Sequence, residues 1–77
     1  MFYRRLGKTE LKVSALGFGC GAGGGLLVKG DPREMVRTVA RAVELGINYL
    51  DTAPLYGFTK SETVVGKALR GVSRDTY

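Results

Sequence analysis

The run Asp31-Pro-Arg-Glu-Met-Val-Arg-Thr-Val-Ala-Arg-Ala-Val-Glu-Leu-Gly46, followed directly by Ile47-Asn-Tyr-Leu-Asp51, decides the fold class. Asp31 can cap a helix, Pro32 suits the first helical position, and Glu34 can reach back to complete a capping box. Apolar residues then recur at helical spacing, namely Met35, Val36, Val39, Ala42 and Val43. Gly46 ends this pattern, so the stretch predicts a helix that enters a strand through a minimal turn.

The flanking segments extend this unit into a βα repeat. Ala15–Gly19 predicts a short apolar strand before the helix, and Thr52–Gly57 is the loop that leaves the second strand. Ser61 is predicted to cap a second helix that ends at Gly71. The apolar face of this helix is Val64, Val65, Ala68 and Leu69. The order strand, helix, strand, helix predicts parallel strands and an α/β fold.

The N-terminal residues predict a β-hairpin. Phe2–Leu6 and Leu11–Ser14 alternate in part around Gly7–Glu10, which places the hairpin at about residues 2–14. We therefore expect residues 1–77 to form one partial domain, a hairpin followed by two βα units. Two strands and two helices cannot cover both faces of a parallel sheet, so we expect the protein to continue after Tyr77 into a third strand.

Composition excludes several classes of function. The 77 residues include one Cys and no His, so neither an internal disulfide nor a Cys/His zinc site can form, and no metal is expected. Twelve Lys and Arg against seven Asp and Glu give a net charge of +5, but the cations do not cluster. Arg33, Arg37 and Arg41 are interleaved with Glu34 and Glu44, as on a solvated helix face, which disfavours nucleic-acid binding. No apolar run approaches the roughly 20 residues of a membrane span, and we expect a cytoplasmic protein without a membrane partner.

Two stretches are candidates for a functional site, and the first is glycine-rich. Gly19-Cys-Gly-Ala-Gly-Gly24 matches the dinucleotide pattern G-x-G-x-x-G, with Glu44 as a nominal ribose-binding acid. That pattern requires a helix to open at the glycines, but the predicted helix starts only at Asp31. Glu44 also falls inside the helix, so a flexible loop is the favoured interpretation.

The second candidate is Asp51-Thr-Ala-Pro-Leu-Tyr-Gly57. Asp51 ends a strand and Tyr56 follows in the loop, so both belong to the C-terminal end of the sheet, where βα barrels carry their chemistry. A tyrosine has a pKa of about 10 and a nearby carboxylate raises that pKa, so a nearby cation is needed for acid catalysis. This segment supplies none. From the residues alone, Asp51 as a loop cap and Tyr56 as a packed aromatic remain the favoured interpretation.

Three stretches of the chain, Tyr3–Gly19, Ala42–Gly57 and Ser61–Leu69, resemble in order the N-terminal part of aldo-keto reductases. The resemblance implies a (β/α)8 TIM barrel of roughly 250 residues or more, with a hairpin closing its bottom. It also implies hydride transfer between NADP(H) and a carbonyl, with small aldehydes, ketones or sugars as substrates and no metal.

The resemblance also implies roles for single residues. Tyr56 would be the general acid that protonates the carbonyl oxygen, and Asp51 would pair with a lysine and contact the nicotinamide end of the cofactor. We expect that lysine just beyond Tyr77, because neither Lys60 nor Lys67 fits its place. The segment Gly19, Cys20 and Gly21 would run beside the nicotinamide and substrate. Cys20 and Gly21 depart from the Thr and bulkier residue that the family often has there, so the size and shape of the substrate stay open.

Residues 1–77 alone are expected to be catalytically inert, since the lysine and a substrate-orienting histidine would be missing. A barrel that binds cofactor as a sensing or assembly subunit, with little turnover, is the alternative function. A third possibility is a natural product of 77 residues, which would be an inactive fragment or an associating subunit. The physiological substrate, the preference between NADPH and NADH, and the oligomeric state are left open by the sequence.

Overall fold

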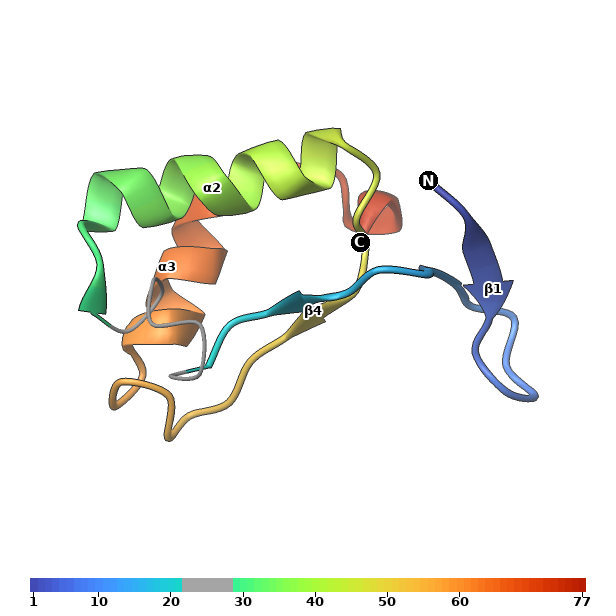
Figure 1. Cartoon of the computed structure of the whole chain (residues 1–77), viewed down its shortest axis with the longest axis horizontal. Coiled ribbons are helices and arrows are strands. Elements are labelled where there is room, and N and C mark those ends of the chain that lie inside the picture. Colours follow the sequence, from blue (N-terminus) through green and yellow to red (C-terminus); the bar gives the residue numbers. More distant parts are fainter. Residues whose placement is uncertain (22–28) are drawn as a thin grey trace.

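The computed structural model describes residues 1–21 and 29–77 (Figure 1). Along the chain, the elements are β1 (Tyr3–Arg5), β2 (Lys12–Ser14), β3 (Phe18–Gly19), α2 (Pro32–Glu44), β4 (Leu50–Asp51), α3 (Lys60–Ala68) and the 3-10 helix η1 (Arg74–Thr76). The predicted glycine loop Gly19–Gly25 lies outside the described residues from position 22 onward.

Strands β1 and β2 form the predicted hairpin. They pair antiparallel, with Tyr3 opposite Ser14 and Arg5 opposite Lys12. Beyond the last of these pairs the Leu6 N–H donates to the Leu11 carbonyl at 2.8 Å. Figure 1 shows the hairpin at one end of the molecule, away from the two helices.

Side chains attach the hairpin to the turn between α2 and β4. Asn48 accepts from the Ser14 N–H at 2.7 Å and donates its own amide to the Lys12 carbonyl at 2.8 Å. The Tyr3 hydroxyl donates to the Gly46 carbonyl at 2.8 Å. Gly46 has φ +99°, and an added Cβ would come within 2.7 Å of the Tyr3 hydroxyl. Glycine is therefore needed here both to end the helix and to let the hairpin approach.

Strands β3 and β4 pair in parallel, which confirms the predicted βα order. Phe18 lies opposite Leu50 and Gly19 opposite Asp51. Both strands are shorter than the predicted Ala15–Gly19 and Ile47–Asp51. Within the described residues each strand has only one hydrogen-bonded neighbour, and no closed barrel is formed. The described fold is thus a small mixed α/β unit.

Helix α2 begins as predicted at Asp31. Its carboxylate accepts from the backbone N–H groups of Arg33 at 2.8 Å and Glu34 at 3.4 Å. The capping box is only half formed, because the Glu34 carboxylate makes no hydrogen bond back to Asp31 in the described part of the chain. The helix buries Met35, Val39 and Ala42.

The prediction that Ser61 caps the second helix is wrong. Helix α3 begins at Lys60, and the preceding Thr59 has φ +74° and, among the described residues, no capping side-chain hydrogen bond. Backbone carbonyls of the preceding turn satisfy the first helical donors instead: the Lys60 N–H donates to Gly57 at 3.2 Å and the Ser61 N–H to Tyr56 at 3.3 Å. The Ser61 hydroxyl is consequently free to point inward, where it is completely buried.

The core lies where the two helices meet the end of β3. Figure 1 shows α2 crossing α3 on one side of the paired strands. The buried cluster consists of Cys20, Met35, Val39, Val64, Val65, Ala68 and Leu69. The predicted apolar face of α3 is therefore confirmed. No helix that the structure describes is both long and apolar enough to cross a membrane.

Candidate functional site

The predicted site residues meet at the C-terminal ends of the two parallel strands. Gly19 ends β3 directly opposite Asp51, the last residue of β4. The next residue along, Cys20, donates its N–H to the Asp51 carbonyl at 2.9 Å. This hydrogen bond keeps the two strand exits side by side, so the chain leaving β3 and the loop leaving β4 start from one place.

Tyr56 folds back from that loop onto Gly21. A Cβ added to Gly21 would lie 3.3 Å from Cζ of Tyr56 and 3.4 Å and 3.5 Å from its two Cε atoms. These nearly equal distances mean that the ring presents its face to Gly21. Any side chain at position 21 would therefore press on the phenol ring of Tyr56.

The backbone after Tyr56 reverses through three consecutive residues of positive φ, Gly57 at 61°, Phe58 at 51° and Thr59 at 74°. For Phe58 and Thr59 this left-handed conformation costs energy, on the order of 1 kcal/mol each. The Thr59 N–H donates to the Pro54 carbonyl at 2.9 Å, and the Tyr56 N–H donates to the Ala53 carbonyl at 3.1 Å. These bonds hold the turn that carries Tyr56.

Asp51 is exposed at the end of β4. Among the described residues, a salt bridge joins Arg41 to Glu44, and no Lys or Arg side chain pairs with Asp51. Lys60 and Lys67 belong to α3 and make no salt bridge with it either. The carboxylate is available to bind a cation or a hydrogen-bond donor of a ligand.

Cys20 is completely buried between the strands and the helices. Its thiol contacts the Phe18 carbonyl at 3.6 Å. Burial first, and the negative charge of Asp51 second, raise the pKa of the Cys20 thiol above its ordinary value. The thiolate is therefore disfavoured at neutral pH, which makes the Cys20 thiol a poor nucleophile.

Sequence reasoning missed the role of Ser61 and its partner Thr52. The Ser61 hydroxyl donates to the Cys20 carbonyl at 2.8 Å and lies 2.8 Å from the Thr52 hydroxyl. Positions 61, 64, 65 and 68 share one face of a helix, and all four are buried. That spacing was the signal that Ser61 belongs to the buried face rather than to the cap.

Gly19 is exposed, and a Cβ added there would meet no atom within 4 Å in the described part of the chain. Among the described residues, the strand backbone beside Asp51 is therefore open on this side. By contrast, no group of three or more His, Cys, Asp or Glu side chains that could hold a metal ion exists among the described residues.

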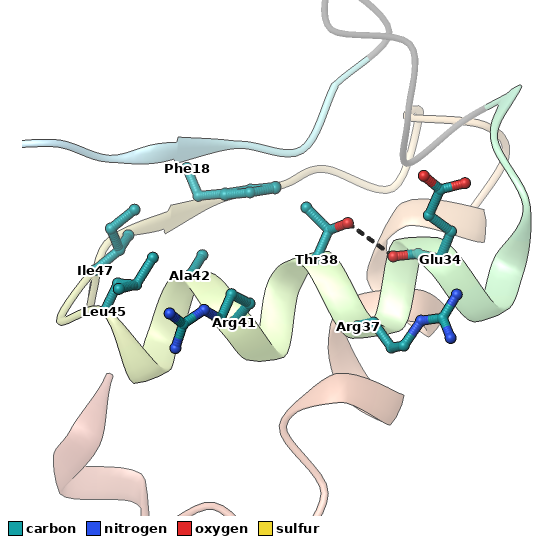
Figure 2. A pocket seen from close by; sticks show the side chains of 8 residues that line it. All are labelled: Phe18, Glu34, Arg37, Thr38, Arg41, Ala42, Leu45 and Ile47. Atoms are coloured by element: carbon teal, nitrogen blue, oxygen red, sulfur yellow. Dashed lines mark hydrogen bonds between the residues drawn. The ribbon is translucent and has the colours of Figure 1, made fainter.

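A separate groove of about 540 Å³ runs along α2 and does not include the predicted site residues. Figure 2 shows Phe18 of β3 lying over Ala42 of α2, with Ile47 and Leu45 near the end of the helix. The other lining residues are Glu34, Arg37, Thr38 and Arg41. The Thr38 hydroxyl is used within the helix, where it donates to the Glu34 carbonyl at 2.8 Å. This groove lacks Asp51 and Tyr56, so it is not the candidate catalytic site.

Comparison with known proteins gives one consistent result. Residues 15–77 match the model of the aldo/keto reductase family. The chain is 46% identical over 76 residues to L-galactose dehydrogenase of Arabidopsis thaliana, covering 96% of this chain and 24% of that protein. It is 42% identical over 73 residues to the NADH-specific methylglyoxal reductase of Escherichia coli K12, covering 91% of this chain and 22% of that protein.

A solved structure agrees with these relatives. The holo form of aldo-keto reductase AKR11C1 from Bacillus halodurans superposes with a TM-score of 0.82 at 45% identity. The match covers 97% of this chain and 24% of that one. The chain therefore spans about a quarter of the length of the proteins that it matches.

Proposed function

The chain belongs to the aldo/keto reductase family, and on that premise we propose that the protein is an oxidoreductase that transfers hydride between NADP(H) and a small aldehyde, ketone or sugar, with Tyr56 as general acid. One observation carries this proposal. The phenol ring of Tyr56 lies against Gly21 beside the ends of two parallel strands, one of which ends in Asp51. The oxidoreductase names of the relatives support the same reaction class.

We also propose that residues 1–77 are the N-terminal part of a (β/α)8 TIM barrel, with the hairpin at its bottom. The parallel β3–β4 pair and the helix that follows each strand support this architecture. In a closed barrel every strand has two neighbours, so β3 would gain a second one.

The residues at the strand ends can be assigned complementary roles. A bound nicotinamide cofactor supplies the hydride for the carbonyl carbon. The Tyr56 hydroxyl donates a hydrogen bond to the carbonyl oxygen and releases its proton as negative charge develops there. The Asp51 carboxylate orients a cation and the cofactor end, and the open backbone of Gly19 accepts a flat ring beside it.

Residues 1–77 alone are proposed to be inert. A phenol acts as an acid near neutral pH only when a cation stabilises its anion, and the described residues place no such cation against Asp51. The cation is proposed to be a lysine outside these 77 residues. Detectable reduction of a carbonyl by purified residues 1–77 would contradict this proposal.

The cofactor is proposed to be NADP(H), although one relative is named as NADH-specific. Steady-state measurements of kcat/KM with NADPH and with NADH, on the same carbonyl substrate, decide between the two. A higher value with NADH would replace this part of the proposal and leave the reaction class intact.

The decisive experiment is Tyr56→Phe in the full-length protein, with Tyr49→Phe as the matched control. Both variants lose only a hydroxyl, but Tyr49 packs beside Gly17 and not against Gly21. We expect Tyr56→Phe to lower kcat about 10²- to 10⁴-fold and Tyr49→Phe to leave it unchanged. Equal turnover in both variants would remove the acid role of Tyr56. An unsubstituted protein that binds NADPH without any turnover would favour the non-catalytic alternative.

A further inference from the structure

We propose that Ser61 is the positioning residue for Tyr56, because it holds both segments whose contact places the phenol ring. This inference rests on the proposed function, in which the place of the Tyr56 hydroxyl matters for proton transfer. Ser61 itself touches neither the reacting atoms nor the phenol hydroxyl in this assignment. It acts through the backbone of Cys20 on one side and the backbone of Tyr56 on the other.

The first contact is made by the Ser61 hydroxyl. A hydroxyl has one proton, and Ser61 gives it to the Cys20 carbonyl at 2.8 Å. The hydroxyl of Thr52, which is 2.8 Å from Ser61, must then be the donor to Ser61. The result is a directed chain from Thr52 through Ser61 to the Cys20 carbonyl. It links the residue after Asp51 to the peptide bond that leads into Gly21.

The second contact is made by the Ser61 backbone. Its N–H donates to the carbonyl of Tyr56 at 3.3 Å. One residue at the start of α3 thus binds the main chain of Tyr56 and the main chain next to Gly21. The Gly21–Tyr56 contact closes the loop of interactions, with a Cβ position at Gly21 only 3.3 Å from the ring.

Burial makes this arrangement sensitive to the hydroxyl. Ser61 is 0% exposed, so water cannot replace its hydrogen bond to Cys20. Removing the hydroxyl leaves the Cys20 carbonyl without this partner in a buried space, whereas the Thr52 hydroxyl is only partly buried. The Cys20 carbonyl regains a partner only by moving, and movement of the Cys20–Gly21 peptide changes the surface on which the Tyr56 ring rests.

Ser14 provides a matched control. It is also buried, at 5% exposure, and its hydroxyl likewise makes two hydrogen bonds. It donates to the Leu16 carbonyl at 2.7 Å and accepts from the Asn48 N–H at 3.1 Å. These bonds lie at the attachment of the hairpin, away from Tyr56. Loss of a buried hydroxyl can therefore be separated from loss of Tyr56 positioning.

The experiment compares Ser61→Ala and Ser14→Ala in the full-length protein. Both variants should lower the urea midpoint of unfolding. Only Ser61→Ala should lower kcat, by about 10- to 100-fold. The KM of the carbonyl substrate should change less than about three-fold, because the substitution misplaces the Tyr56 proton and leaves substrate binding intact. Equal kcat values in the two variants would overturn the inference.

Two additions keep the test decisive. Ser61→Cys keeps a weak donor of similar size and should recover part of the lost kcat, whereas Ser14→Cys should match the unsubstituted protein. If Ser61→Ala does not fold, this pair carries the kinetic test, and an unaltered kcat in Ser61→Cys overturns the inference.

Failure of the proposed function is detected separately, by turnover that survives in Tyr56→Phe. In that event, crystal structures of Ser61→Ala and Ser14→Ala test whether Ser61 positions Tyr56. The distance from Gly21 Cα to the Tyr56 ring must grow in the first variant and stay constant in the second. An unchanged distance in Ser61→Ala overturns the positioning role.

Discussion

The two helices of this chain start by different means. Helix α2 starts at Asp31, whose carboxylate caps two N–H groups within the next three residues. Helix α3 has no such side chain within the described structure, and its first N–H groups bind carbonyls of the turn that carries Tyr56. One start is a property of four consecutive residues, whereas the other exists only when the site is assembled. The helix next to the chemistry is therefore the one whose start depends on tertiary structure.

The largest effect is expected when the packing contact between α2 and α3 is disrupted. Met35 of α2 is completely buried in the cluster that includes Val64 and Val65 of α3. Met35→Ala should lower the free energy of unfolding by about 2–5 kcal/mol and speed amide hydrogen exchange in both helices. Met35→Leu, which conserves volume, should cost less than about 1.5 kcal/mol. If exchange increased in α2 alone, the two helices would not be coupled as the packing indicates.

Removing the cap of α2 should affect only the first turn of that helix. Asp31→Ala removes the acceptor of the Arg33 and Glu34 N–H groups and should cost about 1 kcal/mol. Faster hydrogen exchange should be confined to the first turn of α2, and kcat should not change. Asp31→Asn keeps a capping oxygen and should retain most of the stability. A loss of kcat in Asp31→Ala comparable to that expected for Ser61→Ala would remove the contrast between the two starts.

One substitution within helix α3 should make the protein more stable. Gly66 lies within α3, its φ is ordinary, and an added Cβ meets no atom within 4 Å in the described structure. Gly66→Ala should therefore raise the free energy of unfolding by up to about 1 kcal/mol, measured by urea denaturation. Gly71 has equal space but φ +80°, so Gly71→Ala should be destabilising. If Gly71→Ala raised the free energy of unfolding as well, open space and not backbone conformation would decide the outcome.

The smallest effect is expected on the solvated side of α2. The Arg41–Glu44 ion pair has N···O 3.2 Å, but both side chains are 66% exposed. Glu44→Gln should change the free energy of unfolding by less than about 0.5 kcal/mol, and the difference should vanish at about 1 M salt. A larger, salt-independent effect would mean that other chain covers this face of the helix.

The candidate site shows how far pattern reasoning reaches. The place of Asp51 at a strand end and of Tyr56 in the following loop follows from the order of elements, because parallel strands end on the same edge of a sheet. The contact between Gly21 and the Tyr56 ring does not follow, since it depends on how the turn reverses through Phe58 and Thr59. The catalytic and cofactor-binding roles of these residues stay predictions.

Helix capping was also only partly predictable from local sequence. Ser61 fits a local rule for a helix start, and that rule failed because the turn before α3 already supplies the needed acceptors. The capping box at Glu34 was likewise predicted and only half formed, since an exposed carboxylate has water as an alternative partner. Short-range hydrogen-bond rules are decided by which other partners the fold brings near.

The amino-acid sequence by itself determined the βα order, the start of α2, both apolar helix faces and the family, because all of these rest on residue types at short or fixed spacing. Tertiary structure alone decided the hydrogen bond from Ser61 to the Cys20 carbonyl, the contact of the Tyr56 ring with Gly21 and the burial of Cys20. These three features join residues up to 41 positions apart, from Cys20 to Ser61. No local pattern contains them, since a hydrogen bond between distant segments forms only after packing has brought its donor and acceptor together.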